Sequence, residues 1–210
     1  MARLVGGEIA AAAGVGVSRE TFESLRRYVE ILLDENERQN LISKATVEGI
    51  WQRHIVDSAQ IVGFAQRPDS SWLDIGSGAG LPGMVIAILT EGPVTLVEPR
   101  KLRAEFLGRT VQQLGLSHRV TVLTSKAERI AGRFDVITAR AVASLDTLLN
   151  ISSHLSTDKT LWLFPKGKSA QSELAEVRGK WQGEFCHEQS LTDPAAAIII
   201  AEHVQRKGKR

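Results

Sequence analysis

The sequence predicts an α/β fold: a doubly wound, mainly parallel sheet, preceded by an N-terminal helical extension and followed by a C-terminal antiparallel hairpin. Strand-like and helix-like segments alternate five times between residues 72 and 181, a pattern typical of parallel sheets. The first strand-like run leads into a glycine-rich loop before a helix, as ligand-binding sheets of this kind do. The last two strand-like runs, 184–188 and 196–203, are joined by a turn instead of a helix and therefore predict a hairpin.

The first third of the chain predicts two helices. Ser18 is a good N-cap, and apolar residues recur at helical spacing from there toward Asn40. A second apolar periodicity predicts a helix over 47–63, and a turn follows at 68–71. The alanine-rich stretch 8–17 resembles a signal-peptide core only loosely, so we expect a terminal helix or loop there. Residues 1–69 are thus expected to form the helical extension.

The remaining elements follow in a regular order. Predicted strands span 72–75, 94–97, 119–123, 134–138 and 160–164. Predicted helices span 81–89, 101–114, 126–131, 145–155 and 169–181. Pro82 is expected in the first turn of its helix, where proline is tolerated, and Gly115 is expected to close the helix before it. We expect one sheet domain over 70–205 and a basic tail over 206–210.

Composition excludes several classes of protein. The single cysteine, Cys186, rules out an internal disulfide framework and a multi-cysteine zinc site, and it fits a reducing cytoplasm. The apolar runs are far shorter than the roughly 20 residues of a membrane span. The five histidines are scattered and predict no metal site, and a net charge of +2 does not by itself indicate a nucleic-acid partner. At 210 residues the chain has the size of one ordinary domain with a short appendage.

The glycine-rich loop predicts a cofactor that contains adenosine. Gly76, Gly78 and Gly80 allow a sharp turn and close approach of a ligand, and Glu98 ends the next strand, where it can accept hydrogen bonds from ribose hydroxyls. The dinucleotide fingerprint requires a glycine where this chain has Leu81. Asp74 precedes the loop, where a negative charge suits a cationic amino-acid group better than a pyrophosphate. Both points favour S-adenosylmethionine over a nicotinamide dinucleotide.

Two later strand ends face the same expected crevice. Ala127 and Glu128 follow the third strand, where an adenine would lie, although Ser125 and Glu128 also match a helix capping box. Arg140 follows the fourth strand and is placed for cofactor or substrate, with a solvated surface arginine as the alternative.

Motifs that the sequence lacks exclude several classes of methyl-group acceptor. The segment after the fourth strand lacks the Asn/Asp-Pro-Pro-aromatic run that accompanies methylation of base amino groups. Cys186 lies late in a predicted strand, so we interpret it as packing and not as the nucleophile that methylation of cytosine C5 requires. The remaining class is an acceptor atom that is nucleophilic without losing a proton, and N7 of guanine is such an atom. Catalysis would then consist of alignment and desolvation.

Basic residues predict contacts with phosphates. Some flank Glu98, some follow the fifth strand, and others end the chain, where a solvated tail is the alternative. The candidates are Arg100, Lys101, Arg103, Lys166, Lys168, Arg206, Lys207, Lys209 and Arg210.

Two motifs are more specific than the glycines: Arg-His-x-x-Asp-Ser at 53–58 and Gly-Leu-Pro-Gly at 80–83. With Asn40-Leu41 and the segment 134–141, they resemble the bacterial 16S ribosomal RNA guanine-N7 methyltransferase G family, also called glucose-inhibited division protein B. The resemblance covers about residues 40–166. It implies a Rossmann-like class I methyltransferase that uses S-adenosylmethionine to methylate N7 of one guanine in a decoding-region loop of 16S rRNA. It also implies cofactor contacts from Gly76, Leu81, Ala127, Glu128 and Arg140.

The resemblance further implies an acceptor pocket formed by Asn40, Arg53, His54, Asp57 and Lys166. Asn40 could instead cap the first helix, and His54 could be a packed, hydrogen-bonded histidine. Expected partners are 16S rRNA or the small ribosomal subunit, with a monomeric protein in the cytoplasm and no membrane or metal. The alternatives are a small-molecule methyltransferase and a ribosome-assembly module that binds RNA without turnover.

Overall fold

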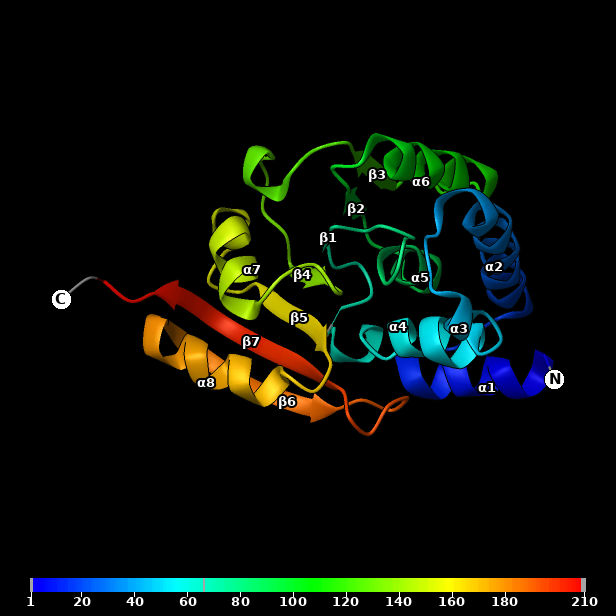
Figure 1. Ribbon diagram of the computed structural model, residues 1–210. Coiled ribbons are helices and arrows are strands. Elements are labelled where there is room, and N and C mark those ends of the chain that lie inside the picture. Colours follow the sequence, from blue (N-terminus) through cyan, green and yellow to red (C-terminus); the bar gives the residue numbers. More distant parts are fainter. Residues whose placement is uncertain (1, 66, 209–210) are drawn as a thin grey trace.

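The computed structural model describes residues 2–65 and 67–208 and contains a seven-stranded sheet in the order β3-β2-β1-β4-β5-β7-β6 (Figure 1). Neighbouring strands from β3 to β5 run parallel, and β7 pairs antiparallel with both β5 and β6. The strands are β1 Trp72–Ile75, β2 Val94–Val97, β3 Val120–Leu123, β4 Val136–Ala139, β5 Leu161–Lys166, β6 Trp181–Gln189 and β7 Ala197–Arg206. The predicted parallel sheet and closing hairpin are confirmed.

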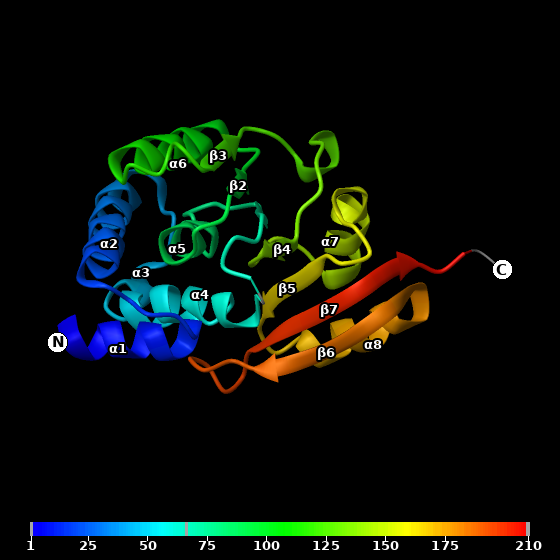
Figure 2. The same cartoon turned by 180° about the vertical axis from the view of Figure 1, so that it is seen from behind.

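Helices cover both faces of the sheet, because strand side chains alternate between two apolar cores. α5 and α6 lie on one side of the sheet and α7 on the other (Figure 2). Trp72 of β1 packs into the core beneath α5 and α6, whereas Leu73 packs into the core beneath α7 and α8. The helices are α5 Gly83–Leu89, α6 Lys101–Gln113, α7 Leu145–Ser152 and α8 Ala170–Lys180, with single 3-10 turns η3 Ala127–Arg129 and η4 Ser153–Leu155.

Two predicted details of these helices are wrong. Pro82 is the residue before α5 and not part of its first turn. The capping box at Ser125 does not form, because the Ser125 hydroxyl bonds the Lys126 carbonyl and Lys126 occupies the cap position of η3.

The extension begins with α1 Ala2–Ala13 and α2 Arg19–Gln39. The Ser18 side chain accepts a hydrogen bond from the Thr21 N–H at 3.1 Å, as its N-cap assignment predicts. Asn40 ends α2 in the left-handed conformation, at φ 50° and ψ 58°. It therefore has the capping role that the sequence analysis left open.

The single helix predicted over 47–63 is wrong. The structure has four short pieces, α3 Lys44–Val47, the π-helix η1 Trp51–Val56, α4 Asp57–Ala59 and the 3-10 turn η2 Val62–Phe64. Apolar periodicity shows which side of a segment is buried, but not whether each N–H bonds four or five residues back. Here the Asp57 N–H bonds the Gln52 carbonyl, which widens the helix. Such π-helical turns occur frequently at functional sites.

The extension has its apolar core in common with the sheet. Leu25, Tyr28 and Leu32 of α2 are fully buried in the same cluster as Met84 and Phe106. Figure 1 shows α2 beside α5 and α6, and α1 along α4. Among the described helices, none is both long and apolar enough to cross a membrane. A domain boundary at residue 69 stays a prediction.

Candidate functional site

The side chains of Glu98, Asp74 and Tyr28 anchor the backbone of the glycine-rich loop after β1, in addition to the bonds that the Gly76 and Ser77 N–H groups make to the Val97 carbonyl. The Gly78 N–H donates to Glu98 Oε2 at 2.9 Å, and the Gly83 N–H donates to Asp74 Oδ2 at 3.1 Å. The Ala79 carbonyl accepts from the Tyr28 hydroxyl at 2.9 Å. Three glycines of the loop have left-handed φ angles, a conformation that residues with a side chain rarely adopt. These are Gly76 at 68°, Gly78 at 54° and Gly80 at 90°.

Two buried carboxylates face this loop. Burial raises the pKa of Asp74 to about 7, and its Oδ1 has no hydrogen-bond partner among the described residues. Oδ1 is therefore a buried acceptor for which the described residues supply no donor, and a ligand ammonium group is a donor of the right kind. Glu98 is also buried, and its second oxygen accepts from the Arg100 N–H at 2.8 Å. A glycine cradle with an unpaired carboxylate oxygen fits the amino-acid end of S-adenosylmethionine.

The other positions predicted for the cofactor lie around this loop. Leu81 is buried in the loop, and Ala127 is buried in η3 at the carboxyl end of β3, with Glu128 exposed beside it. The segment after β4 approaches from the other side. A Cβ built on Gly76 would lie 2.6 Å from Val142 Cγ2, so Val142 covers Gly76 directly.

A cavity of about 440 Å³ lies beside Arg140 and the segment after β4. Its walls come from η1, the segment after β4, the end of β5 with the start of α8, and the turn between β6 and β7. Four residues predicted for the acceptor pocket line it together with Arg140: Arg53, His54, Asp57 and Lys166. The fifth, Asn40, is not among its lining residues within the described chain.

Arg140 is the centre of a polar network in this cavity. Its Nη1 lies 3.3 Å from Asp57 Oδ2 and 3.4 Å from His54 Nδ1. Since a guanidinium can only donate, His54 Nδ1 accepts, and Nε2 carries the proton toward Thr46 Oγ1 at 2.9 Å. Burial and the charges of Arg140 and Arg53 lower the pKa of His54 to about 4. The imidazole is therefore neutral near pH 7.

The C-terminal turn is fastened to this network by residues that sequence reasoning missed. Thr192 Oγ1 donates to Asp57 Oδ1 at 2.6 Å, and the Leu191 N–H donates to Gln60 Oε1 at 2.9 Å. Gln60 Nε2 also bonds Asp57 Oδ1 at 2.9 Å. No local pattern predicts the two contacts made by the turn, because their partners lie 131 and 135 residues apart in sequence.

Lys166 does not have the free charge expected of a phosphate contact. Its Nζ lies 2.9 Å from Glu173 Oε2 and donates to the Ala143 carbonyl at 2.6 Å, and its side chain is only 10% exposed. Lys166 therefore fastens the segment after β4 to α8 and forms part of the cavity wall.

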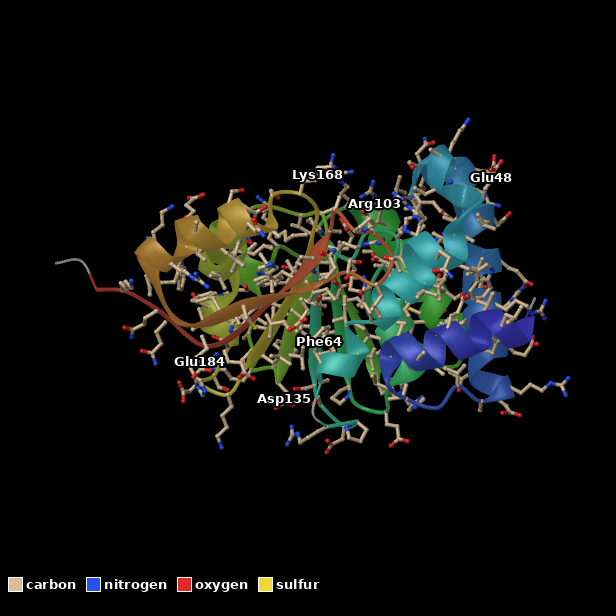
Figure 3. The ribbon with its side chains drawn as sticks, turned by 90° about the horizontal axis from the view of Figure 1, so that it is seen from below. Glu48, Phe64, Arg103, Asp135, Lys168 and Glu184 are labelled. Atoms are coloured by element: carbon tan, nitrogen blue, oxygen red, sulfur yellow. The ribbon has the colours of Figure 1, made fainter. Side chains whose placement is uncertain are left out.

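The remaining predicted cations divide between two ends of the sheet. Arg100 and Lys101 are exposed after β2, and Figure 3 shows Arg103 and Lys168 along one edge, opposite Asp135 and Glu184. Arg103 lies beside the glycine loop, with Nη1 3.7 Å from the position of a Gly78 Cβ.

The cations predicted for the tail are not at that edge. Because β7 runs antiparallel to β5, it carries Arg206 away from the cavity to the opposite end. There, Arg206 bonds Asn150 Oδ1 at 2.7 Å and lies over the Trp181 ring, and Lys207 Nζ bonds the Arg178 carbonyl at 2.7 Å. Arg206 belongs to β7 and not to a free tail, and residues 209–210 lie outside the described part of the chain.

Solved structures of other proteins have the same fold. M. jannaschii TYW2, determined in complex with AdoMet, has a TM-score of 0.57 and 12% identity, covering 79% of this chain and 78% of that one. A fibrillarin/Nop5p complex has a TM-score of 0.56 and 17% identity, covering 72% and 81%. At these identities the similarity shows the class I methyltransferase fold alone, as the sequence predicted.

Sequence comparison identifies the family. A family model described as rRNA small subunit methyltransferase G matches residues 21–197. Ribosomal RNA small subunit methyltransferase G of Rhizorhabdus wittichii is 50% identical over 196 residues, covering 92% of this chain and 90% of that protein. The protein of that name from Zymomonas mobilis is 46% identical over 205 residues, covering 93% and 92%. The chain therefore belongs to the rRNA small subunit methyltransferase G family.

Proposed function

We propose that this protein transfers a methyl group from S-adenosylmethionine to N7 of a guanine in 16S rRNA of the small ribosomal subunit. In a chain of this family, the observation that carries the proposal is the position of Arg140 between the polar cavity and the glycine loop. Arg140 lines the polar cavity, and its charge also acts on the buried Asp74 carboxylate beside the glycine loop. A cofactor cradle and an acceptor cavity thus meet at one side chain.

The residues proposed to hold the cofactor surround the glycine loop. Asp74 Oδ1 is buried without a partner among the described residues and would accept from its ammonium group, and Arg140 suits its carboxylate. Glu98 would accept from the ribose hydroxyls while it keeps the Gly78 N–H. Leu81, Ala127 and Glu128 complete the proposed adenosine contacts. When bound, S-adenosylmethionine supplies an electrophilic methyl group on a sulfonium centre.

The cavity suits an acceptor that does not lose a proton. N7 of guanine attacks with an in-plane lone pair, so orientation and removal of water are the main requirements. His54 is neutral near pH 7 and is held by Arg140 and Thr46, which suits a positioning role better than general-base catalysis. Methylation makes the purine cationic, and the Asp57 carboxylate in the cavity wall would stabilise that charge.

The exposed cations at the carboxyl end of the sheet are proposed to bind the RNA backbone. Arg53 borders the cavity. Arg100, Lys101 and Arg103 lie at the start of α6, and Lys168 precedes α8. Arg206 and Lys207 face the other end, so a contact from them would need RNA that reaches around the hairpin. We further propose that the protein is a monomer and that it acts in the cytoplasm. The location is supported by the ribosomal substrate and fits the single cysteine.

The test uses labelled S-adenosylmethionine with small ribosomal subunits and with naked 16S rRNA. We expect label at N7 of one guanine, located by chemical cleavage at 7-methylguanine. Gly78→Asp should abolish cofactor binding and labelling together. Label on small molecules that RNA does not compete away would support the small-molecule alternative. RNA binding that Gly78→Asp leaves intact, with no label from the unaltered protein, would support the non-catalytic module.

A further inference from the structure

The glycine loop has one anchor that comes from outside the sheet. Tyr28 lies in α2 of the N-terminal extension, is fully buried, and donates its hydroxyl hydrogen to the Ala79 carbonyl, 51 residues further along the chain. The other two anchors, Asp74 and Glu98, are carboxylates at the ends of β1 and β2. Among the anchors in the described chain, Tyr28 alone couples the loop to the extension.

The contact leaves the loop little freedom to move. A Cβ built on Gly80 would lie 3.1 Å from the Tyr28 hydroxyl oxygen and 2.6 Å from Met84 Cγ. The phenol therefore fits directly against a glycine in the left-handed conformation. A shift of the Ala79 peptide would change both neighbouring loop residues, and Gly78 bears the N–H that Glu98 holds.

The Tyr28 hydroxyl is a hydrogen-bond donor at neutral pH. Burial raises the pKa of Tyr28 far above its usual range, so the phenol keeps its proton. If the hydroxyl is removed while the ring remains, the packing of α2 is preserved, but the Ala79 carbonyl is left without its donor in a dry environment. An unsatisfied buried carbonyl is costly, and the loop relieves that cost by moving.

We propose that Tyr28 is a positioning residue for the cofactor: through the Ala79 carbonyl, it fixes the shape of the glycine loop, so the extension sets cofactor affinity. The inference rests on the proposed use of this loop by S-adenosylmethionine. It gives α2 a role in ligand binding besides its packing role.

The test compares Tyr28→Phe with a matched control, Thr110→Val. Thr110 is fully buried in α6 and its hydroxyl bonds the Phe106 carbonyl at 2.9 Å, so the control also removes one buried hydroxyl that bonds a carbonyl. Calorimetric titration with S-adenosylmethionine and with S-adenosylhomocysteine gives Kd, and thermal unfolding gives Tm. We expect Tyr28→Phe to raise Kd by about tenfold. Thr110→Val should lower Tm without a comparable change in Kd.

A second readout uses the fact that Tyr28 is the single tyrosine of the chain. Protein labelled with 13C at the tyrosine Cζ gives one resonance, which should shift as cofactor is added. An equal Kd for Tyr28→Phe and unaltered protein, or a resonance that does not move on saturation, overturns the inference. If unaltered protein binds no cofactor, the proposed function fails instead, so the two failures are distinguishable.

Discussion

The glycine loop and the cavity beside Arg140 are built in opposite ways. The loop is one run of consecutive residues, 74–83, whose shape depends on backbone conformation and on the lack of side chains. The cavity is assembled from four separate segments, and Asp57 and Thr192 meet there although they are 135 residues apart. A single methyl group added to a glycine of the loop should therefore abolish cofactor binding. The cavity should lose activity in steps as single contacts are removed.

The largest expected effect is that of Gly83→Ala at the end of the loop. Its Cβ would lie 2.4 Å from Leu96 Cδ2 and 2.5 Å from Asp74 Oδ2, both in buried surroundings. We expect a loss of about 3 kcal/mol in the free energy of unfolding, measured in urea, and no detectable cofactor binding. Gly108→Ala is the control, because nothing lies within 4 Å of its Cβ position in α6. It should stabilise the helix by about 0.5–1 kcal/mol.

Equal unfolding free energies for the two glycine variants would contradict the view that the loop has no room for a side chain. Retention of cofactor binding by Gly83→Ala would do the same.

Arg140→Met should have the next largest effect, because it removes the centre of the cavity network. Loss of the contacts to Asp57 and His54 should lower the rate of RNA methylation by about 100-fold. The pKa of His54 should also rise from about 4, since one of the positive charges that lower it is gone, although burial continues to hold it below 6.5. NMR titration of the histidine Cε1–H signals measures that change. A His54 pKa that stays at about 4 would show that the network is not as described.

Thr192→Val tests the contribution of the C-terminal turn. It removes the donor to Asp57 Oδ1 but keeps the side-chain volume, so we expect methylation to slow by about tenfold. Cofactor Kd should be unchanged, because the change lies in the cavity and not in the loop. Thr121→Val, at an exposed position on β3, is the control and should alter neither quantity. A raised cofactor Kd for Thr192→Val would mean that the two regions are not separable.

The same contrast explains what sequence reasoning could and could not find. Glycine spacing and the alternation of strands and helices are local patterns, and they predicted the glycine loop and the parallel sheet that the structure has. Glu98 was predicted from the same patterns, and it lies at the loop, where it accepts from the Gly78 N–H. His54 and Asp57 were found through a motif within one short segment. Thr192 and Gln60 were missed because their roles arise only when the hairpin folds back onto the extension.

The sequence also did not show which basic side chains are free to contact phosphates. Lys166 looks like a free cation in a sequence, but Glu173 from α8 neutralises it. Arg206 looks like part of a basic tail, but the antiparallel direction of β7 carries it away from the cavity.

The π-helix at 51–56 was also not predicted, because one extra residue in a turn leaves the apolar pattern almost intact.

The smallest expected effect is a pH dependence that belongs to the loop alone. Burial raises the pKa of Asp74 to about 7, so part of the free protein is protonated there near neutral pH. A ligand ammonium group at Oδ1 favours the carboxylate, so binding should release protons at pH 7, and cofactor affinity should rise by about fivefold from pH 6 to pH 8. His54, with a pKa of about 4, stays neutral over this range, so the cavity adds no such dependence.

Calorimetry in buffers of different ionisation enthalpy measures the proton release directly. Asp74→Asn should bind the cofactor more weakly, with no proton release and a flat pH profile between 6 and 8. Asp57→Asn is the matched control, since it removes a carboxylate of the cavity and should leave the proton release at pH 7 intact. Release that persists in Asp74→Asn would assign the titrating group elsewhere. Release that disappears in Asp57→Asn would show that the cavity network, through Arg140, governs the ionisation of the loop.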